Sequence, residues 1–389
     1  MTDPLATTLA HLSDQTDPAA PAGRWFDTLS RGRRRVVIFG TGQLGRIALE
    51  GARGAGLDIL AFADNNPALA GQLVEGVPVL PPTQAVDAFD RIACFIVAIF
   101  NGSQPRAQLA ALGASAIVPY PAFYWKYPEA MPSMPHLELP DQVLADPAAI
   151  ERGYRCLADE RSRTEFAAQI AWRCTLDYRC LPQADPHAEM YFAPDLVAPG
   201  PGEIFVDCGA FDGDSIRAFL AVTENRFERI LAIEPDAVNR ARLGAWIAGQ
   251  PPEQAERIAV LPFGLGDTAE RVGFASTGTV ATHRTVATGD QSIEIRRLDD
   301  LLAAERPSFI KMDIEGAEPA AIRGAAGVLA RHRPIVAACA YHRGEHLWTL
   351  PRLLADAVPD YRIYLRRYAE ECWETVYYAI PPERVLAGA

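Results

Sequence analysis

The sequence predicts an α/β protein with two Rossmann-like domains, each built around a mostly parallel sheet. Short apolar runs alternate with amphipathic segments, an order that is typical of parallel sheets. A glycine-rich turn follows the first apolar run of each half, at Gly40 and at Gly209. With 389 residues, the chain exceeds what a single hydrophobic core organises, so two domains are expected.

The pattern divides the chain into four segments. Residues 1–24 are rich in Ala, Pro, Asp and Thr without sustained periodicity, which predicts a flexible tail. Residues 25–126 predict the first α/β domain, and residues 127–195 predict a helical linker or cap, because prolines precede amphipathic stretches there. Residues 196–389 predict the second α/β domain, with an antiparallel hairpin over 361–380 at the edge of its sheet.

Composition excludes several classes of partner. The chain has 37 basic and 49 acidic side chains, and this net charge of −12 opposes binding to nucleic acid or to anionic lipid. Neither nucleic acid nor a membrane is therefore expected as a partner. The seven cysteines contain no CxxC pair, so no disulfide framework or zinc site is indicated. The N-terminus has no secretory signal, which predicts a cytoplasmic protein. A homo-oligomer remains open.

The first glycine-rich turn has the spacing of a dinucleotide-binding fingerprint. Gly40, Gly42 and Gly45 lie between a predicted strand and a predicted helix, and Asp64 ends the next strand. Such glycines let a phosphate approach the helix amides, and the acid can hold a ribose diol. The alternative is that the turn only packs a helix on a sheet. These four residues form a candidate nucleotide site.

The stretch GLDILAFADNNPALAGQLVEGVPVLPP extends this interpretation. It resembles the Rossmann-like N-terminal domain found on several sugar-modifying enzymes of polysaccharide biosynthesis, over about residues 35–125. That resemblance implies binding of a nucleotide or nucleotide-sugar. Hydride transfer is not expected, because a short-chain dehydrogenase needs a tyrosine four residues before a lysine. Ala122 and Pro307 occupy those positions before Lys126 and Lys311, the only lysines.

The second glycine-rich turn has a different chemistry. Asp207 ends the predicted strand, and Gly209 and Gly213 lie in the turn. S-adenosylmethionine carries no phosphate, so its site needs glycines that admit the methionine moiety and acids that meet its ammonium and ribose hydroxyls. Glu234 ends the next strand, where its carboxylate can accept both ribose hydroxyls. The alternative for Glu234 is an acid that starts a helix before Pro235.

Further candidates follow the later strands. Phe263 and Gly264 could line an adenine slot, although Phe263 could equally be part of the core. Three acids, Asp313, Glu315 and Glu318, surround the end of the strand FIKM, where open α/β sheets place their ligands. Asp313 is assigned to the cofactor site. Mg²⁺ would suit such oxygen ligands, but no ligand set is visible, so no metal site is assigned.

The order of these motifs resembles that of the FkbM-type methyltransferases. The D-x-G turn, the E-P strand end, the stretch FIKMDIEGAEPAAIRGAAGVL and the segments AYHRGEHLWTLP and YLRRYAEECWETVYYAIP carry the resemblance, from residue 191 to 381. It implies a class I methyltransferase with a seven-stranded sheet, S-adenosylmethionine as cofactor, and O-methylation of a sugar, nucleotide-sugar or natural-product small molecule. Polysaccharide or natural-product biosynthesis is the implied setting.

Methyl transfer to an alcohol needs a base as well as alignment. His342 closes the strand PIVAACAY, and a neutral imidazole there is the first candidate for the base. Asp313 is the second candidate. The alternative for His342 is a structural hydrogen bond. A different class of function also stays open, a nucleotide-sugar-binding or regulatory protein whose methyltransferase half is a non-catalytic scaffold.

Overall fold

The computed structural model describes residues 3–15, 23–134, 136–275, 284–286 and 291–387. The chain forms two compact units. The N-terminal unit consists of Met1–Ala145 and Ala168–Leu181, and the C-terminal unit of Asp146–Ala167 and Pro182–Ala389. The segment predicted as one linker is therefore divided between the two units, and the boundary falls inside helix α9 (Glu160–Thr175).

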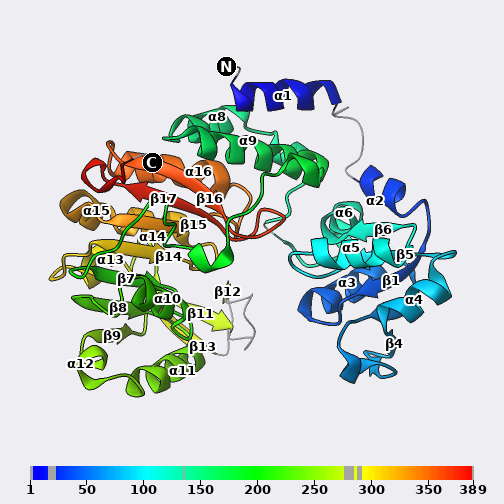
Figure 1. Ribbon diagram of the computed structural model, residues 1–389, viewed down its shortest axis with the longest axis horizontal. Helices are drawn as coiled ribbons and strands as arrows, with labels where there is room; N and C mark the ends of the chain where they lie inside the picture. Colours follow the sequence, from blue (N-terminus) through cyan, green and yellow to red (C-terminus); the bar gives the residue numbers. More distant parts are fainter. Residues whose placement is uncertain (1–2, 16–22, 135, 276–283, 287–290, 388–389) are drawn as a thin grey trace. The chain divides into compact units, whose positions relative to one another are not determined.

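The N-terminal unit contains a six-stranded sheet in the order β3-β4-β2-β1-β5-β6, of which β1, β4, β5 and β6 are labelled in Figure 1. All neighbours are parallel except β3 and β4, which form a short antiparallel pair. The strands are β1 (Arg35–Phe39), β2 (Asp58–Ala63), β3 (Leu73–Val74), β4 (Val77–Leu80), β5 (Ala93–Val97) and β6 (Ile117–Pro119). Apolar side chains of β1 and β5 form its buried core, as the continuous apolar runs predict.

Helices complete this unit. They are α1 (Pro4–Gln15), α2 (Arg24–Leu29), α3 (Gln43–Gly54), α4 (Pro82–Phe89), α5 (Ser103–Ala111), α6 (Tyr120–Lys126) and α7 (Pro140–Val143), with single turns η1 (Pro67–Leu69), η2 (Pro128–Ala130) and η3 (Tyr178–Cys180). Helix α1 lies within the segment 1–24, for which the sequence predicted a flexible tail and no helix. Asp3 accepts a hydrogen bond from the amide of Leu5 at its start, and Leu5 and Leu12 are buried.

The C-terminal unit contains a seven-stranded sheet in the order β16-β17-β15-β14-β7-β8-β9. The five strands β15, β14, β7, β8 and β9 run parallel to one another. Strand β17 is antiparallel to both β15 and β16. The strands are β7 (Ile204–Cys208), β8 (Arg229–Ile233), β9 (Ile258–Leu261), β14 (Phe309–Met312), β15 (Ile335–Cys339), β16 (Arg362–Arg367) and β17 (Thr375–Ile380). The predicted fold class and its edge hairpin are confirmed.

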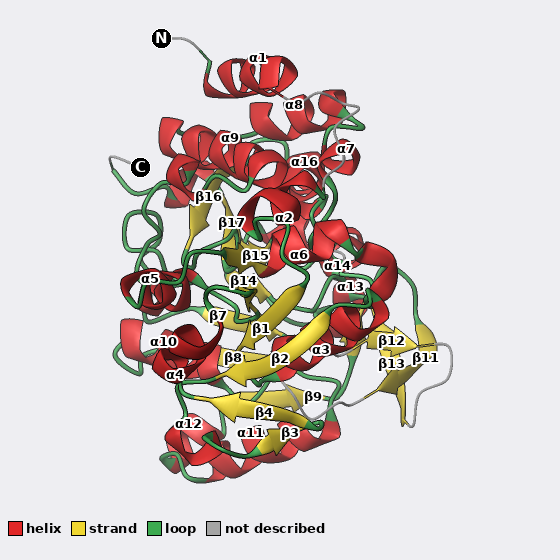
Figure 2. Ribbon diagram, turned by 90° about the vertical axis from the view of Figure 1, so that its right-hand side faces the viewer, coloured by secondary structure: helices red, strands yellow, loops and turns green. Residues whose placement is uncertain are grey.

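The strand order reverses between β7 and β14. From β7 the chain proceeds through β8 to β9 towards one edge, and from β14 through β15 towards the other. Because such crossovers are right-handed, the helices of the two halves cover opposite faces, and Figure 2 shows α10 and α14 on opposite sides of the strands. The crevice over the carboxyl ends of β7 and β14 is the place where open α/β sheets bind ligands.

The helices of this unit are α8 (Pro147–Arg155), α10 (Asp214–Val222), α11 (Ala237–Ala248), α12 (Pro252–Ala255), α13 (Leu298–Leu301), α14 (Glu318–Gly324), α15 (Ala326–His332) and α16 (His346–Ala357), with the turns η4 (His187–Glu189) and η5 (Pro382–Arg384). None of the helices in the described part of the chain is both long and apolar enough to cross a membrane.

A second sheet lies between β9 and β14 in the sequence. It contains β10 (Gly264–Leu265), β11 (Glu270–Ala275), β12 (Arg284–Val286) and β13 (Gln291–Arg296) in the order β10-β13-β11-β12. Ile293 and Ile295 of β13 are buried and form a small core with Val272. The sequence analysis did not anticipate this sheet.

Candidate active site

A cavity of about 490 Å³ opens over the strand ends of the seven-stranded sheet, and its volume falls in the range of small-molecule sites. One half of its lining follows β8 and β9 or belongs to the second sheet, and it is mostly apolar. The other half follows β14, β15 and β16 and carries acids and tyrosines. The lining includes Tyr191, Gly209, Phe211, Glu234, Phe263, Gly264, Ile293, Ile295, Lys311, Asp313, Glu315, Tyr341 and Glu374, with His187 on η4.

The turn after β7 can only be made with glycine. Gly209 has a φ of +86°, and a Cβ atom there would lie 1.9 Å from the carbonyl oxygen of Asp313. Close approach between the ends of β7 and β14 therefore depends on this missing side chain. Gly213, with a φ of +91°, precedes α10 and lies outside the cavity lining.

A buried ion pair lies beneath this turn. Asp207 and Lys311 occupy neighbouring positions of β7 and β14, so their side chains leave the same face of the sheet. Their side chains are 0% and 2% exposed, and Lys311 Nζ is 3.0 Å from Asp207 Oδ1. The ammonium also donates to the carbonyl oxygen of Gly209 at 2.8 Å and lies 5.2 Å from the centre of the Tyr191 ring.

Burial raises the pKa of Asp207 to about 6 against the opposing effect of the Lys311 ammonium. The pKa of Lys311 is shifted upward because the acids Asp207 and Asp313 outweigh its burial. Both groups are therefore mainly charged at neutral pH. Asp207 was predicted to touch the cofactor, but the structure places it behind the lining, where it fixes Lys311 and so the turn.

Glu234 lies at the end of β8 and lines the cavity, as predicted for a ribose-binding acid. Its Oε2 accepts a hydrogen bond from the amide of Phe211 at 2.9 Å, and its Oε1 accepts from the amide of Asp236 at 2.8 Å. These bonds fix the carboxylate in one orientation, and each carboxylate oxygen can accept more than one hydrogen bond. Glu234 can thus hold the turn and still receive a ligand hydroxyl.

Phe263 and Gly264, the predicted adenine slot, lie beside Glu234 in the lining. Phe263 is half-buried, and the guanidinium of Arg296 stands 5.4 Å from its ring centre. Ile293 and Ile295 of the second sheet line the same side of the cavity. This side therefore offers a flat apolar surface next to a carboxylate, which suits a nucleoside.

Asp313 is the centre of the polar half. Its Oδ2 accepts from the hydroxyl of Tyr191 at 2.7 Å and its Oδ1 from that of Tyr341 at 3.3 Å, while His342 Nε2 lies 3.2 Å from Oδ1. Burial alone would raise its pKa, but His342, Lys311 and Tyr191 together hold the pKa of Asp313 well below 3.8. Asp313 is therefore permanently ionised and a weak base.

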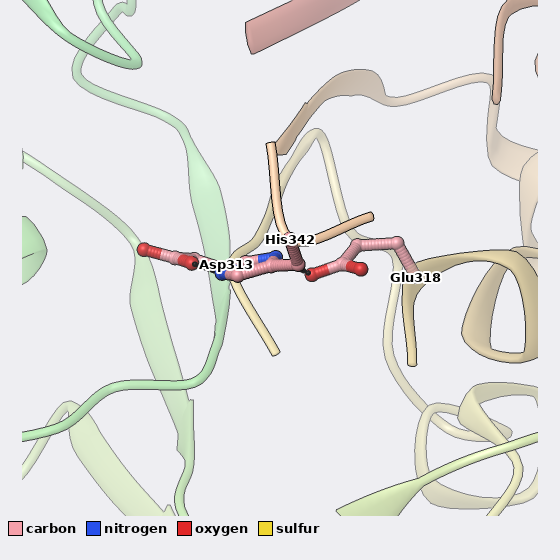
Figure 3. A group of neighbouring side chains, drawn as sticks. All are labelled: Asp313, Glu318 and His342. Atoms are coloured by element: carbon pink, nitrogen blue, oxygen red, sulfur yellow. Dashed lines mark ion pairs between the residues drawn. The ribbon is translucent and has the colours of Figure 1, made fainter. Parts of the chain in front are cut away.

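His342 bridges two carboxylates, as Figure 3 shows. Its Nδ1 lies 2.8 Å from Oε1 of Glu318, and its Nε2 faces Asp313. Glu318 is completely buried and also accepts a hydrogen bond from the amide of Ile314 at 2.9 Å. The three side chains are near enough to one another to hold a metal ion, but each imidazole nitrogen faces a carboxylate at hydrogen-bonding distance, so we assign no metal site.

This environment corrects the prediction of a neutral His342 base. Burial would lower its pKa, but the carboxylates of Glu318 and Asp313 outweigh burial and raise the pKa of His342 well above 6.5. The imidazole is thus a cation at pH 7 and has no lone pair for a proton. It also lies outside the cavity lining, behind Asp313.

Four lining residues have a strained backbone, and the sequence singled out only Glu315 among them, as an acid near the end of a strand. Tyr191, Phe211, Glu315 and Glu374 all line the cavity with φ values of +69°, +45°, +56° and +50°. Non-glycine residues rarely adopt this conformation, and such strain concentrates at functional sites. Two of them carry carboxyls, and burial raises the pKa of both Glu315 and Glu374 to about 7. The sequence gives no signal for these left-handed positions.

The first glycine-rich turn has the expected backbone. Gly40 has a φ of +104°, and a Cβ atom on Gly45 would lie 2.0 Å from the carbonyl oxygen of Gly40, whereas Gly42 has open space around it. Asp64, however, already accepts hydrogen bonds from the amide and hydroxyl of Thr41 at 2.9 and 2.6 Å. The nucleotide site on this unit remains a prediction.

The sheet order and the cavity define a methyltransferase fold, and the comparisons identify the family. Residues 207–370 belong to the methyltransferase FkbM domain family. A crystal structure of a methyltransferase FkbM from Methylobacillus flagellatus KT matches at 25% identity with a TM-score of 0.78, over 97% of this chain and 100% of that chain. The C-terminal unit is therefore a methyltransferase of the FkbM type.

More distant structures match only in part. A precorrin-6y C5,15-methyltransferase from Geobacter metallireducens GS-15 matches at 11% identity and a TM-score of 0.30, over 50% of this chain and 85% of that chain. A putative caffeoyl-CoA O-methyltransferase from Staphylococcus aureus matches at 10% identity and a TM-score of 0.29, over 51% and 85%. Neither bears on function. The comparison with curated proteins finds no match.

Removing the buried ammonium should destabilise the C-terminal unit. Lys311→Met leaves the buried Asp207 carboxyl without its cation, which costs about 3–5 kcal/mol of unfolding free energy. Urea unfolding at pH 7, followed by tryptophan fluorescence, measures this loss. The double variant Asp207→Asn with Lys311→Met removes both charges and should lose less than Lys311→Met alone. An equal loss in both variants would contradict the ion-pair account.

The raised pKa of His342 makes stability depend on pH. The folded protein keeps this proton above pH 6.5, where the unfolded chain loses it, so the stabilisation is complete below pH 6.5. It declines above pH 6.5 by about 1.4 kcal/mol per pH unit until pH passes the folded pKa. The difference in unfolding free energy between the protein and His342→Gln should follow this decline from pH 6.5 to 8.5. A difference that stays constant over this range would contradict the raised pKa of His342.

Proposed function

We propose that the C-terminal unit binds S-adenosylmethionine and transfers its methyl group to a hydroxyl of a small molecule, a sugar, a nucleotide-sugar or a natural product. The observation that supports this most is the composition of the cavity. A fixed carboxylate and apolar surface lie over β8 and β9, and acids and tyrosines lie over β14 and β15, within one space of about 490 Å³. Such a cavity can align a nucleoside cofactor and a polar acceptor.

The apolar half fits the adenosine end of the cofactor. Glu234 would accept hydrogen bonds from the ribose hydroxyls, and Phe263, Ile293 and Ile295 would pack against the adenine. Gly209, without a side chain, would leave room for the methionine moiety along the turn. The cofactor supplies the methyl group on a sulfonium, and the nearby carboxylates favour that positive charge.

The polar half fits a neutral or cationic acceptor better than an anionic one. Asp313, Glu315 and Glu374 all face it, while Lys311 is held by Asp207. A phosphate or carboxylate close to the methylated hydroxyl would meet like charge. Of the acceptor classes, a sugar hydroxyl remote from any phosphate is therefore favoured.

We further propose that the reaction takes place in the cytoplasm. None of the seven cysteines, all of which lie in the part of the chain that the structure describes, forms a disulfide, and five of them are buried. Free thiols are typical of proteins in a reducing compartment.

Calorimetric titration with S-adenosylhomocysteine tests the cofactor site. The protein should bind it with micromolar affinity, and Glu234→Gln should weaken binding about 10- to 100-fold, because bonds from hydroxyls to a charged carboxylate are lost. Glu253→Gln, an exposed carboxylate on α12 outside the cavity, is the matched control and should bind as the parent does. Circular dichroism checks that the turn held by Glu234 stays folded.

NAD and a nucleotide-sugar serve as comparison ligands in the same titration. Binding of either one without any binding of S-adenosylhomocysteine would overturn the methyltransferase proposal and move the function to the N-terminal unit. A screen of neutral and anionic sugars with tritium-labelled S-adenosylmethionine then identifies the acceptor, and we expect label on the neutral ones.

A further inference from the structure

Transfer of a methyl group to an alcohol requires a group that takes the hydroxyl proton. The two bases predicted from sequence do not serve, because Asp313 is too weakly basic and His342 is a buried cation. The reacting half of the cavity must therefore supply another acceptor. The need for this proton acceptor rests on the proposed O-methyl transfer.

Most polar groups of this half are unsuited to the role. Tyr191 and Tyr341 have pKa values well above 10, because burial and the negative charge of Asp313 disfavour the phenolate. Lys311 is a cation with its protons directed at Asp207 and Gly209. Four lining groups around this half remain as proton acceptors, namely His187, Asp214, Glu315 and Glu374.

Position distinguishes these four. Asp214 is exposed, and its Oδ1 already accepts a hydrogen bond from the amide of Ser215 at 2.7 Å. His187 lies on the short turn η4 and is exposed, and Glu315 is also exposed, with 34% of its side chain open to solvent. Glu374 is half-buried and lies in the connection between β16 and β17, with a φ of +50° that fixes it at the rim. A base shielded from water competes less with solvent for the hydroxyl proton.

Contacts also distinguish Glu374. Its neighbour is the hydroxyl of Tyr341, which lies 3.3 Å from Asp313 Oδ1 and can donate its single proton to either carboxylate. Glu374 thus belongs to the network that surrounds the end of β14, where the strand order reverses. The Trp373 ring lies 6.1 Å from that of Tyr341 and supports the same connection from behind.

We propose that Glu374 is the catalytic base of this enzyme. Its carboxylate hydrogen-bonds to the acceptor hydroxyl and takes the proton as the hydroxyl oxygen bonds to the methyl carbon. The bond from carbon to sulfur breaks, its electron pair stays on sulfur, and S-adenosylhomocysteine leaves as a neutral thioether. Glu374 ends the step as a carboxylic acid and returns its proton to solvent.

The charges around Glu374 suit this cycle. Burial first, and then the negative charges of Asp313 and Asp214, raise its pKa to about 7, while the His342 cation and the bond from Tyr341 oppose the rise. Near neutral pH both forms are populated, which is the condition under which a general base is most effective. The sulfonium of the bound cofactor would favour the carboxylate form.

Two probes that need no acceptor test this assignment. Sinefungin carries an ammonium group at the position of the transferred methyl group, so Glu374 should bind it directly, whereas S-adenosylhomocysteine has nothing there. Glu374→Gln should lower the ratio of sinefungin to S-adenosylhomocysteine affinity about tenfold, since a charge-assisted hydrogen bond is lost. Glu253→Gln, at the exposed carboxylate on α12 outside the cavity, is the control and should leave that ratio unchanged.

Calorimetry of S-adenosylmethionine binding at pH 6.5, in buffers of different ionisation enthalpy, provides the second readout. The sulfonium should expel about half a proton from the parent and clearly less from Glu374→Gln, whereas the control Glu253→Gln should behave as the parent does. An unchanged ratio and an unchanged proton release in Glu374→Gln would overturn the assignment, and the same losses in Glu315→Gln would move the base there. Absence of any cofactor binding by the parent would instead refute the proposed function itself.

Discussion

The ammonium of Lys311 is the interaction on which the cavity depends. It is buried between β7 and β14, where Asp207 compensates its charge and the carbonyl oxygen of Gly209 accepts one of its protons. One side chain thereby joins the two strands at which the sheet order reverses. The turn after β7 and the end of β14 can approach closely because Gly209 has no side chain. The lining residues Gly209 and Asp313 follow directly from these two strands.

Charges alternate outward from the junction. Asp207 faces Lys311, the pKa of Asp313 is lowered by Lys311 and His342 together, and His342 faces Glu318 on its other side. An isolated charge in this interior would be costly, and the alternation lets each one be compensated. As a result the groups nearest the sheet are fixed in one protonation state. Proton transfer is left to carboxyls farther out on the rim.

Much of the fold could be predicted from the sequence. Continuous apolar runs such as those of β7, β8 and β14 reveal buried parallel strands, and alternation over β16 and β17 reveals the edge hairpin. The short strands β3, β4 and β10 and the helix α1 were not predicted, because such short segments show too little hydrophobic periodicity. The boundary between the two units was not predicted either, since it depends on which core each part of helix α9 packs against.

From the sequence, only the site residues that directly follow a predicted strand could be located. Glu234, Gly209, Phe263, Gly264 and Asp313 line the cavity because each follows a strand that the sequence reveals. The chemistry of individual groups needs their neighbours. His342 looks like a base in the sequence and is a cation in the structure, because Glu318 is brought beside it by the start of α14.

Glu374 shows the opposite case, since nothing in its sequence context singles it out. It lies in an irregular connection whose left-handed residues Glu371, Cys372 and Glu374 have no pattern to recognise. Function in this protein is therefore divided between positions set by the regular sheet, which sequence reveals, and positions set by strained turns, which it does not.

A crystal structure of the protein with S-adenosylhomocysteine would test the central claim most directly. The account predicts the ligand over the carboxyl ends of β7 and β8, with both ribose hydroxyls on Glu234, the adenine beside Phe263 and the sulfur directed towards Asp313 and Glu374. A ligand bound elsewhere, or a ribose that does not contact Glu234, would contradict it.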